Sequence, residues 1–154
     1  MKKLQNIVKA ILLVLPLLFT ACKSNKEIKV CQLLLTMTKT DCLGPCPNYT
    51  VNFYTDGKMD ITPKAYAIVK KNSSGRLTEA QLSNLKKKIE ALKVEDLQTK
   101  YDDKLLMDAP STILTFYTTS PKKEIKARIR FPEKLKIFIK ELEAIVKTTN
   151  WKSA

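Results

Sequence analysis

A short hairpin signal constrains the fold of this chain more than any other feature. Tyr49, Val51 and Phe53 alternate with polar residues, and Asp56-Gly57 follows directly. Alternation that ends in Asp-Gly predicts a half-buried strand over 49–55, a tight turn and a return strand over 58–62. Because strands joined by a tight turn pair antiparallel, the chain is expected to build an antiparallel sheet.

Two amphipathic helices accompany this hairpin. Thr78 and Gln81 form a capping-box pair, which predicts a helix from Thr78 to about Lys93. The apolar residues after the cap recur at helical spacing: Leu82, Leu85, Ile89 and Leu92. A second helix is expected from Pro132 onward, because proline is favoured in a first helical turn and a broad apolar face comes after it.

Further segments have the composition of strands. Residues 30–38 are apolar and β-branched, and residues 112–119 indicate another strand. Residues 124–131 alternate strictly. Their inward side chains are expected to be Ile125, Ala127, Ile129 and Phe131, and their outward ones Lys126, Arg128 and Arg130. Residues 65–70 either continue the return strand or form a short edge strand, residues 72–75 are a turn-rich break, and residues 94–111 form a long loop.

The order of these elements predicts the fold class. It is α+β, with a single antiparallel sheet of four to five strands and two helices packed on one face, in the order ββ(β)αββα. Such a layer would bury both helix stripes and leave Lys126, Arg128 and Arg130 on the open face. The whole forms a single domain over residues 30–151, with no internal repeat.

Residues 1–21 have the order of a bacterial lipoprotein signal peptide. A lysine-bearing start precedes an apolar run, and small residues lie immediately before Cys22. The run Leu18 to Cys22 resembles a lipobox, although Phe19 stands where leucine is usual. We expect a lipid on the Cys22 thiol and a tether over 22–29, so that the protein is lipid-anchored in the bacterial cell envelope and faces the periplasm or the cell exterior. The alternatives are an ordinary secretory signal and an uncleaved anchor.

Charge and composition limit the classes of function. The formal net charge is +13, and removing the three lysines of residues 1–21 leaves +10. Such a surface favours an acidic envelope protein or an anionic glycan, and outside the cytoplasm nucleic acid is not expected as a partner. The alternative is a solvated, lysine-rich surface. The absence of histidine removes Ser-His-Asp and Cys-His catalysis and histidine-ligated metals. We expect that the protein is not an enzyme and that it binds no cofactor and no metal.

The run from Cys42 to Cys46 is the most distinctive of the mature chain. Gly44 and Pro45 can bend the chain between the two cysteines, and in an oxidising compartment the pair predicts a local disulfide. A redox pair and a three-thiolate metal site with Cys31 are the alternatives, and Cys31 itself is expected as a buried free thiol. The acidic residues Asp102, Asp103 and Asp108 are expected in a solvated loop rather than in a calcium or catalytic site.

A family resemblance rests on the cysteine loop and on several residues nearer the C-terminus. The loop contributes Cys42, Gly44, Pro45, Cys46, Pro47 and Tyr49, and the Asp56-Gly57 turn, Tyr101, the run Asp108 to Pro110 and Trp151 come later in the same order. This set resembles the family known as domain of unknown function 6438, over about residues 32–151. The resemblance implies the fold and an envelope setting, and it carries no activity or catalytic residue.

The expected function is that of a lipid-anchored, non-catalytic envelope module. It would bind a partner through its sheet face, with Lys126, Arg128 and Arg130, or through the loop from Cys42 to Cys46, while the lipid on Cys22 holds it to the membrane. The first alternative is a thiol-active envelope protein that uses Cys42 and Cys46. The second is an inhibitor or immunity-type module that blocks an envelope enzyme.

Overall fold

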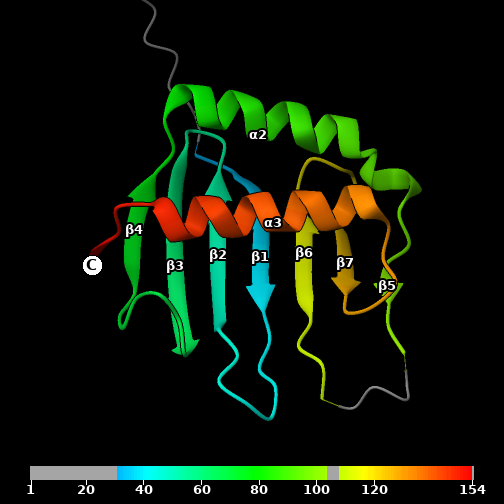
Figure 1. Ribbon diagram of the computed structural model, residues 1–154. Coiled ribbons are helices and arrows are strands. Elements are labelled where there is room, and N and C mark those ends of the chain that lie inside the picture. Colours follow the sequence, from blue (N-terminus) through cyan, green and yellow to red (C-terminus); the bar gives the residue numbers. More distant parts are fainter. Residues whose placement is uncertain (1–30, 104–107, 154) are drawn as a thin grey trace, which may run out of the picture.

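A single eight-stranded sheet forms the centre of the molecule, in the order β5-β7-β6-β1-β2-β3-β4-β8. The computed structural model describes residues 31–103 and 108–153 (Figure 1). The strands are β1 (Leu33–Lys39), β2 (Asn48–Tyr54), β3 (Lys58–Ala65), β4 (Ser73–Arg76), β5 (Lys100–Tyr101), β6 (Thr112–Phe116), β7 (Lys123–Ala127) and β8 (Lys152–Ser153). The helices are α2 (Glu79–Leu92), the 3-10 turn η2 (Val94–Asp96) and α3 (Glu133–Thr148).

The predicted α+β class is confirmed, and the predicted sheet of four to five antiparallel strands is too narrow. The sheet is mixed, because β5 pairs parallel with β7 while the neighbouring pairs from β7 through to β8 are antiparallel. The additional strands are short: β5 and β8 have two residues each. Segments of this length have no detectable periodicity. The fourth strand, β4, occupies the stretch expected as a turn-rich break.

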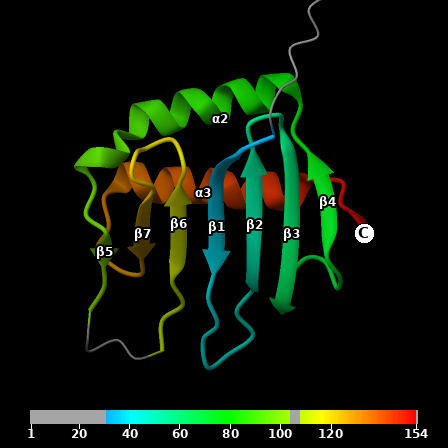
Figure 2. The same ribbon diagram turned by 180° about the vertical axis from the view of Figure 1, so that it is seen from behind.

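Both helices bury their apolar stripes in one core. In β2 the residues Tyr49, Val51 and Phe53 are buried and alternate with half-buried polar neighbours. The same core takes in Leu85 and Ile89 of α2 and the apolar side chains of α3. Figures 1 and 2 show α3 crossing the strands on one face, with α2 beside it near the end at which the β2–β3 hairpin turns. The other face carries no helix of the described residues.

The ends of α2 lie where its sequence predicts them. Thr78 accepts a hydrogen bond from the backbone of Gln81, whose side chain accepts from the backbone of Thr78, so the capping box is complete. At the other end Lys93 adopts a left-handed conformation with φ of 49° and closes the helix. The helix therefore begins and ends through its own local sequence, as expected for a strong capping signal.

The strand expected over 124–131 stops at Ala127. The backbone amides of Arg128 and Ile129 both donate to the carbonyl oxygen of Tyr101, at 2.9 and 3.3 Å, so the chain bends there instead of continuing the ladder. Arg130 then has a positive φ of 53°. The predicted inward positions Ile129 and Phe131 consequently lie outside the strand and are only half-buried.

Cys31 also differs from its prediction. The sequence places it on the apolar side of the first strand, but β1 begins two residues later, and Cys31 is an exposed free thiol. The pKa of the Cys31 thiol is raised above its ordinary 9.0, first by partial desolvation and then by the charge of the nearby Asp56 carboxylate. A thiol with a raised pKa is mostly protonated at neutral pH and is a poor nucleophile.

We predict that Gly75→Ala lowers the unfolding free energy by about 1–3 kcal/mol, the usual cost of overpacking. A Cβ at Gly75 would lie 2.5 Å from Cγ2 of Thr149 and 3.2 Å from the ring of Trp151. The Trp151 ring is held by a hydrogen bond to the carbonyl of Val146, so it cannot give way freely. Urea unfolding measures the change. Gly44→Ala is the control, because its nearest contact is 3.8 Å away, and an equal loss in both variants would contradict the prediction.

Candidate functional site

The predicted disulfide between Cys42 and Cys46 is present, with the two Cα atoms 5.8 Å apart. Gly44 makes the turn inside it: its amide donates to Sγ of Cys42 at 3.2 Å, and its carbonyl accepts from the amide of Cys46 at 2.8 Å. Leu43 projects from this loop with 85% of its surface exposed. The loop is therefore a compact, closed turn that presents an apolar tip to solvent.

A second chain segment, residues 108–111, is fixed against this loop. The amide of Thr40 donates to the carbonyl of Ser111 at 3.0 Å, and the amide of Ser111 donates to the Thr40 hydroxyl at 2.8 Å. The Ser111 hydroxyl in turn accepts a hydrogen bond from Nε of Arg128 at 3.1 Å. Because Ser111 is buried, with 1% of its surface exposed, these bonds join the two segments into one rigid end of the sheet.

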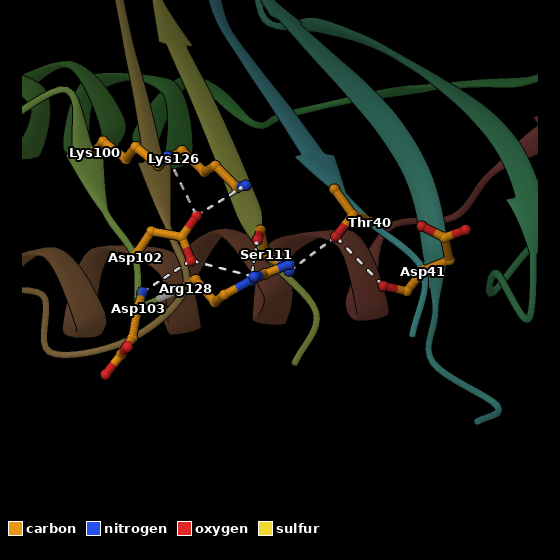
Figure 3. Close-up of polar contacts among 8 residues, drawn as sticks. All are labelled: Thr40, Asp41, Lys100, Asp102, Asp103, Ser111, Lys126 and Arg128. Atoms are coloured by element: carbon orange, nitrogen blue, oxygen red, sulfur yellow. Dashed lines mark hydrogen bonds and ion pairs between the residues drawn. The ribbon is translucent and has the colours of Figure 1, made fainter. Parts of the chain in front are cut away.

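Asp102 lies at the centre of a cluster of cations beside this junction (Figure 3). Its carboxylate is 3.1 Å from Nζ of Lys126, 3.2 Å from Nη1 of Arg128 and 3.7 Å from Nζ of Lys100. The hydrogen bond from Lys126, followed by the charge of Arg128, holds the pKa of Asp102 below its ordinary 3.8. The sequence placed Asp102 in a solvated loop, but its side chain is only 13% exposed and organises this face of the sheet.

The basic row predicted for the open face is thus partly neutralised. Lys126 and Arg128 share the Asp102 carboxylate, whereas Arg130 is mostly exposed and lies 3.9 Å from Asp103. Three cations around Asp102 leave an excess of two positive charges. The cations of this face therefore form a set of charge pairs rather than a free cationic stripe.

A polar hollow of about 450 Å³ lies between these groups. Four sequence-distant parts line it: the disulfide loop, the segment at 108–111, β6 and the basic residues at the end of β7. Its lining residues are Thr40, Asp41, Cys42, Leu43, Asp108, Ala109, Ser111, Ile113, Lys126 and Arg128. The carboxylates of Asp41 and Asp108 belong to the loops, and the cations to the strand side. The hollow can therefore bind a polar segment that carries both kinds of charge.

An apolar groove of about 430 Å³ lies on the helix side of the same two segments. The disulfide loop contributes Cys46 and Pro47, and the second segment contributes Pro110. Tyr49 is buried in its floor, where burial, followed by the nearby Glu143 carboxylate, raises the pKa of the phenol to about 12. The disulfide loop and residues 108–111 thus form a wall with a polar hollow on one side and an apolar groove on the other.

The sequence predicts some of these residues and gives no sign of others. Cys42, Cys46, Gly44, Pro47 and Tyr49 were expected in one loop motif, and they all lie in or next to the wall; Pro45 is exposed on its turn. The missed contributors are Thr40, Ser111, Tyr66 and Ile68. Tyr66 and Ile68 line the groove from a segment expected to be a strand. The positive φ of Tyr66 and the exposure of both side chains have no signal in sequence periodicity.

We predict that Asp102→Asn lowers the melting temperature at neutral pH, because it leaves Lys100, Lys126 and Arg128 without their shared counter-ion. A carboxyl whose folded pKa is depressed stabilises the fold above its unfolded pKa and loses that contribution as pH falls. The difference from wild type should therefore shrink below about pH 4 and in high salt. Thermal melts test this. The control is Glu133→Gln, which removes an exposed ion pair with Lys136. Equal losses of melting temperature in the two variants, or a loss in Asp102→Asn that does not change with pH, would contradict the prediction.

The geometry defines a class: a small α+β domain with one helix-covered face, one open polar face and a disulfide-closed loop at one end of its sheet. The chain belongs to the family described as Domain of unknown function (DUF6438), which matches residues 33–146. This match runs from β1 into α3 and includes the whole wall between the hollow and the groove. The resemblance to this family is thereby confirmed. No curated protein and no solved structure matches the chain.

The described residues contain neither a membrane-spanning helix nor a metal-binding cluster. No helix within residues 31–103 and 108–153 is long and apolar enough to cross a membrane. Over the same ranges, no three cysteine or acidic side chains converge in an arrangement that could hold a metal ion. The predicted signal peptide, the lipidated Cys22 and the tether over 22–29 lie outside the described residues.

Proposed function

We propose that this protein is a lipid-anchored, non-catalytic binding module of the bacterial cell envelope. A lipid on Cys22 would hold it to the membrane, and the end of the sheet that carries the disulfide loop would bind a protein partner. The observation that carries this proposal is the convergence of sequence-distant segments on one rigid wall, flanked by the polar hollow and the apolar groove.

The path of β1 supports an outward-facing site. The chain enters the sheet at Leu33, near α2, and the disulfide loop lies beyond the opposite end of the same strand (Figure 1). Seven residues at about 3.3 Å each separate the two ends by roughly 20 Å. With an anchor at Cys22, the loop would therefore be displayed on the side of the domain away from its tether.

The anchor is tested by the intact mass of the protein from its native membrane. A mature chain that starts at Cys22 and carries lipid mass, with one cysteine pair protected from alkylation until reduction, supports the proposal. A chain without lipid, or one cut elsewhere, removes the anchor from it.

The binding end is tested by photo-crosslinking in living cells. Leu43→p-benzoylphenylalanine places the crosslinker on the exposed tip of the disulfide loop. The control position is Ile137, which is 51% exposed on the outer side of α3. We expect a discrete adduct with one envelope protein from position 43 and none from position 137. Equal adducts at both positions, or none at position 43, would contradict the proposal.

A thiol-active protein is the second candidate, and one contact favours it. The Gly44 amide donates to Sγ of Cys42, a bond that would stabilise a Cys42 thiolate after reduction. Alkylation of intact cells separates the two functions. Rapid labelling of Cys42 and Cys46 without prior reduction would favour thiol chemistry, whereas labelling only after reduction favours the binding module.

A further inference from the structure

The apolar groove has an unusual rim of exposed apolar side chains. Tyr66 and Ile68, which line it from the β3–β4 connection, are 69% and 50% exposed. Beneath them the groove is lined by Pro47, Tyr49 and Val146. A concave apolar floor with exposed apolar edges leaves apolar surface in contact with water in the isolated chain. Such a surface is typical of a site that another molecule covers.

The backbone of Tyr66 supports the same conclusion. Its φ is +51°, a left-handed conformation that is uncommon for an aromatic residue and costs conformational energy. Most of its side chain faces solvent, so burial within the folded chain does not offset that cost. The conformation does place an aromatic ring at the edge of the groove, where aromatic residues are typical binding anchors.

The charges around the groove select the kind of occupant. The β3–β4 connection, residues 66–72, contains two lysines, Lys70 and Lys71, and no acidic residue. Lys147 adds a further cation from α3. Glu143, which also lines the groove, is paired with Lys39 at 2.6 Å. The surroundings of the apolar floor are therefore positive, and they complement a ligand that combines an apolar group with carboxylates.

From these observations we propose that the groove binds an extended acidic segment of the partner protein. One or two apolar side chains of that segment enter the groove between Pro47 and Ile68, and its carboxylates face Lys147 and the lysines of the β3–β4 connection. This inference rests on the proposed function, because it names the chemistry of the partner that the disulfide-loop end binds. A second copy of the chain is a less suitable occupant, since its net charge is strongly positive.

The test measures peptide binding by the full lipidated chain in phospholipid nanodiscs. The probe is a fluorescent, acetylated peptide GDELFEG, and the matched probes are GKKLFKG, with reversed charge, and GDESSEG, without the apolar pair. Fluorescence anisotropy should show binding of the first peptide and at least about tenfold weaker binding of the other two. A dissociation constant above about 1 mM for GDELFEG would overturn the inference.

Matched variants assign the binding to the groove. Ile68→Glu adds a negative charge at the rim and should weaken GDELFEG binding by at least about tenfold. Ile137→Glu is the control, because Ile137 is equally exposed but lies on α3 away from the groove. Lys147→Glu should also weaken binding, and Lys140→Glu should not. If Ile68→Glu binds like wild type, the groove is not the site.

The remaining outcomes separate this inference from the proposed function. If sedimentation shows a dimer that Ile68→Glu dissociates, a second copy covers the groove and the inference is wrong. If the crosslink from position 43 persists in cells while GDELFEG does not bind, the binding module stands and only the chemistry assigned to its groove is wrong. If both fail, the proposed function fails with the inference.

Discussion

Phe116→Ala is expected to lower the unfolding free energy by about 3–5 kcal/mol, the usual cost of emptying a large aromatic site in a core. Phe116 ends β6 with none of its surface exposed, and its ring lies 6.1 Å from that of Phe138 on α3, centroid to centroid. The substitution therefore removes a contact between the sheet and the helix that covers it. Because domains of this size have only about 5–15 kcal/mol of stability, the variant should be close to unfolding at physiological temperature.

Urea unfolding followed by circular dichroism measures this loss as a lower midpoint with an unchanged slope. Tyr117→Ala is the matched control: it truncates the neighbouring aromatic residue, which is 36% exposed and lies over the Lys122 ammonium group. That variant should lose less than about 1 kcal/mol. Similar midpoints for both variants would mean that the Phe116 ring does not hold α3 on the sheet.

Local signals explain how much of the fold could be predicted. The alternation before Asp56-Gly57 and the capping box at Thr78 act within a few residues, so the hairpin and α2 were both predicted. The strand β4 could not be predicted, because Ser73, Ser74 and Gly75 have turn composition. Gly75 is needed there, since Thr149 and Trp151 fill the space of its missing side chain. Contacts from another part of the chain override local preference.

In the candidate site, too, the features formed by residues close in sequence could be predicted, and those formed by distant residues could not. The disulfide was predictable because its cysteines are four residues apart. The wall was not, because its central hydrogen bond joins Thr40 and Ser111, which are 71 residues apart. The role of Asp102 depends on Arg128 in the same manner, 26 residues further on. Sequence periodicity describes one element at a time, and these pairs form only when the sheet brings β1, β6 and β7 together.

Removal of the disulfide should affect stability and partner binding together. Cys42→Ser/Cys46→Ser opens a loop of five residues, and the loss of that constraint on the unfolded chain should cost about 2 kcal/mol. The core is untouched, so the domain stays folded. The loop carries Thr40 at its base and Leu43 at its tip, and it separates the hollow from the groove. Freed from its closed turn, it should lose the ordered shape that a partner recognises.

Two measurements in the same variant check this. Urea unfolding should show the loss of about 2 kcal/mol, and the crosslink from position 43 should fall by at least about tenfold. The matched control is Cys31→Ser, which removes an exposed free thiol outside the loop and should change neither quantity. If the double variant retains full stability but loses the crosslink, the disulfide acts through its chemistry, and the thiol-active alternative gains over the binding module. If it loses stability but retains the crosslink, the partner still binds at the loop, and the closed shape that the disulfide imposes is not what it recognises.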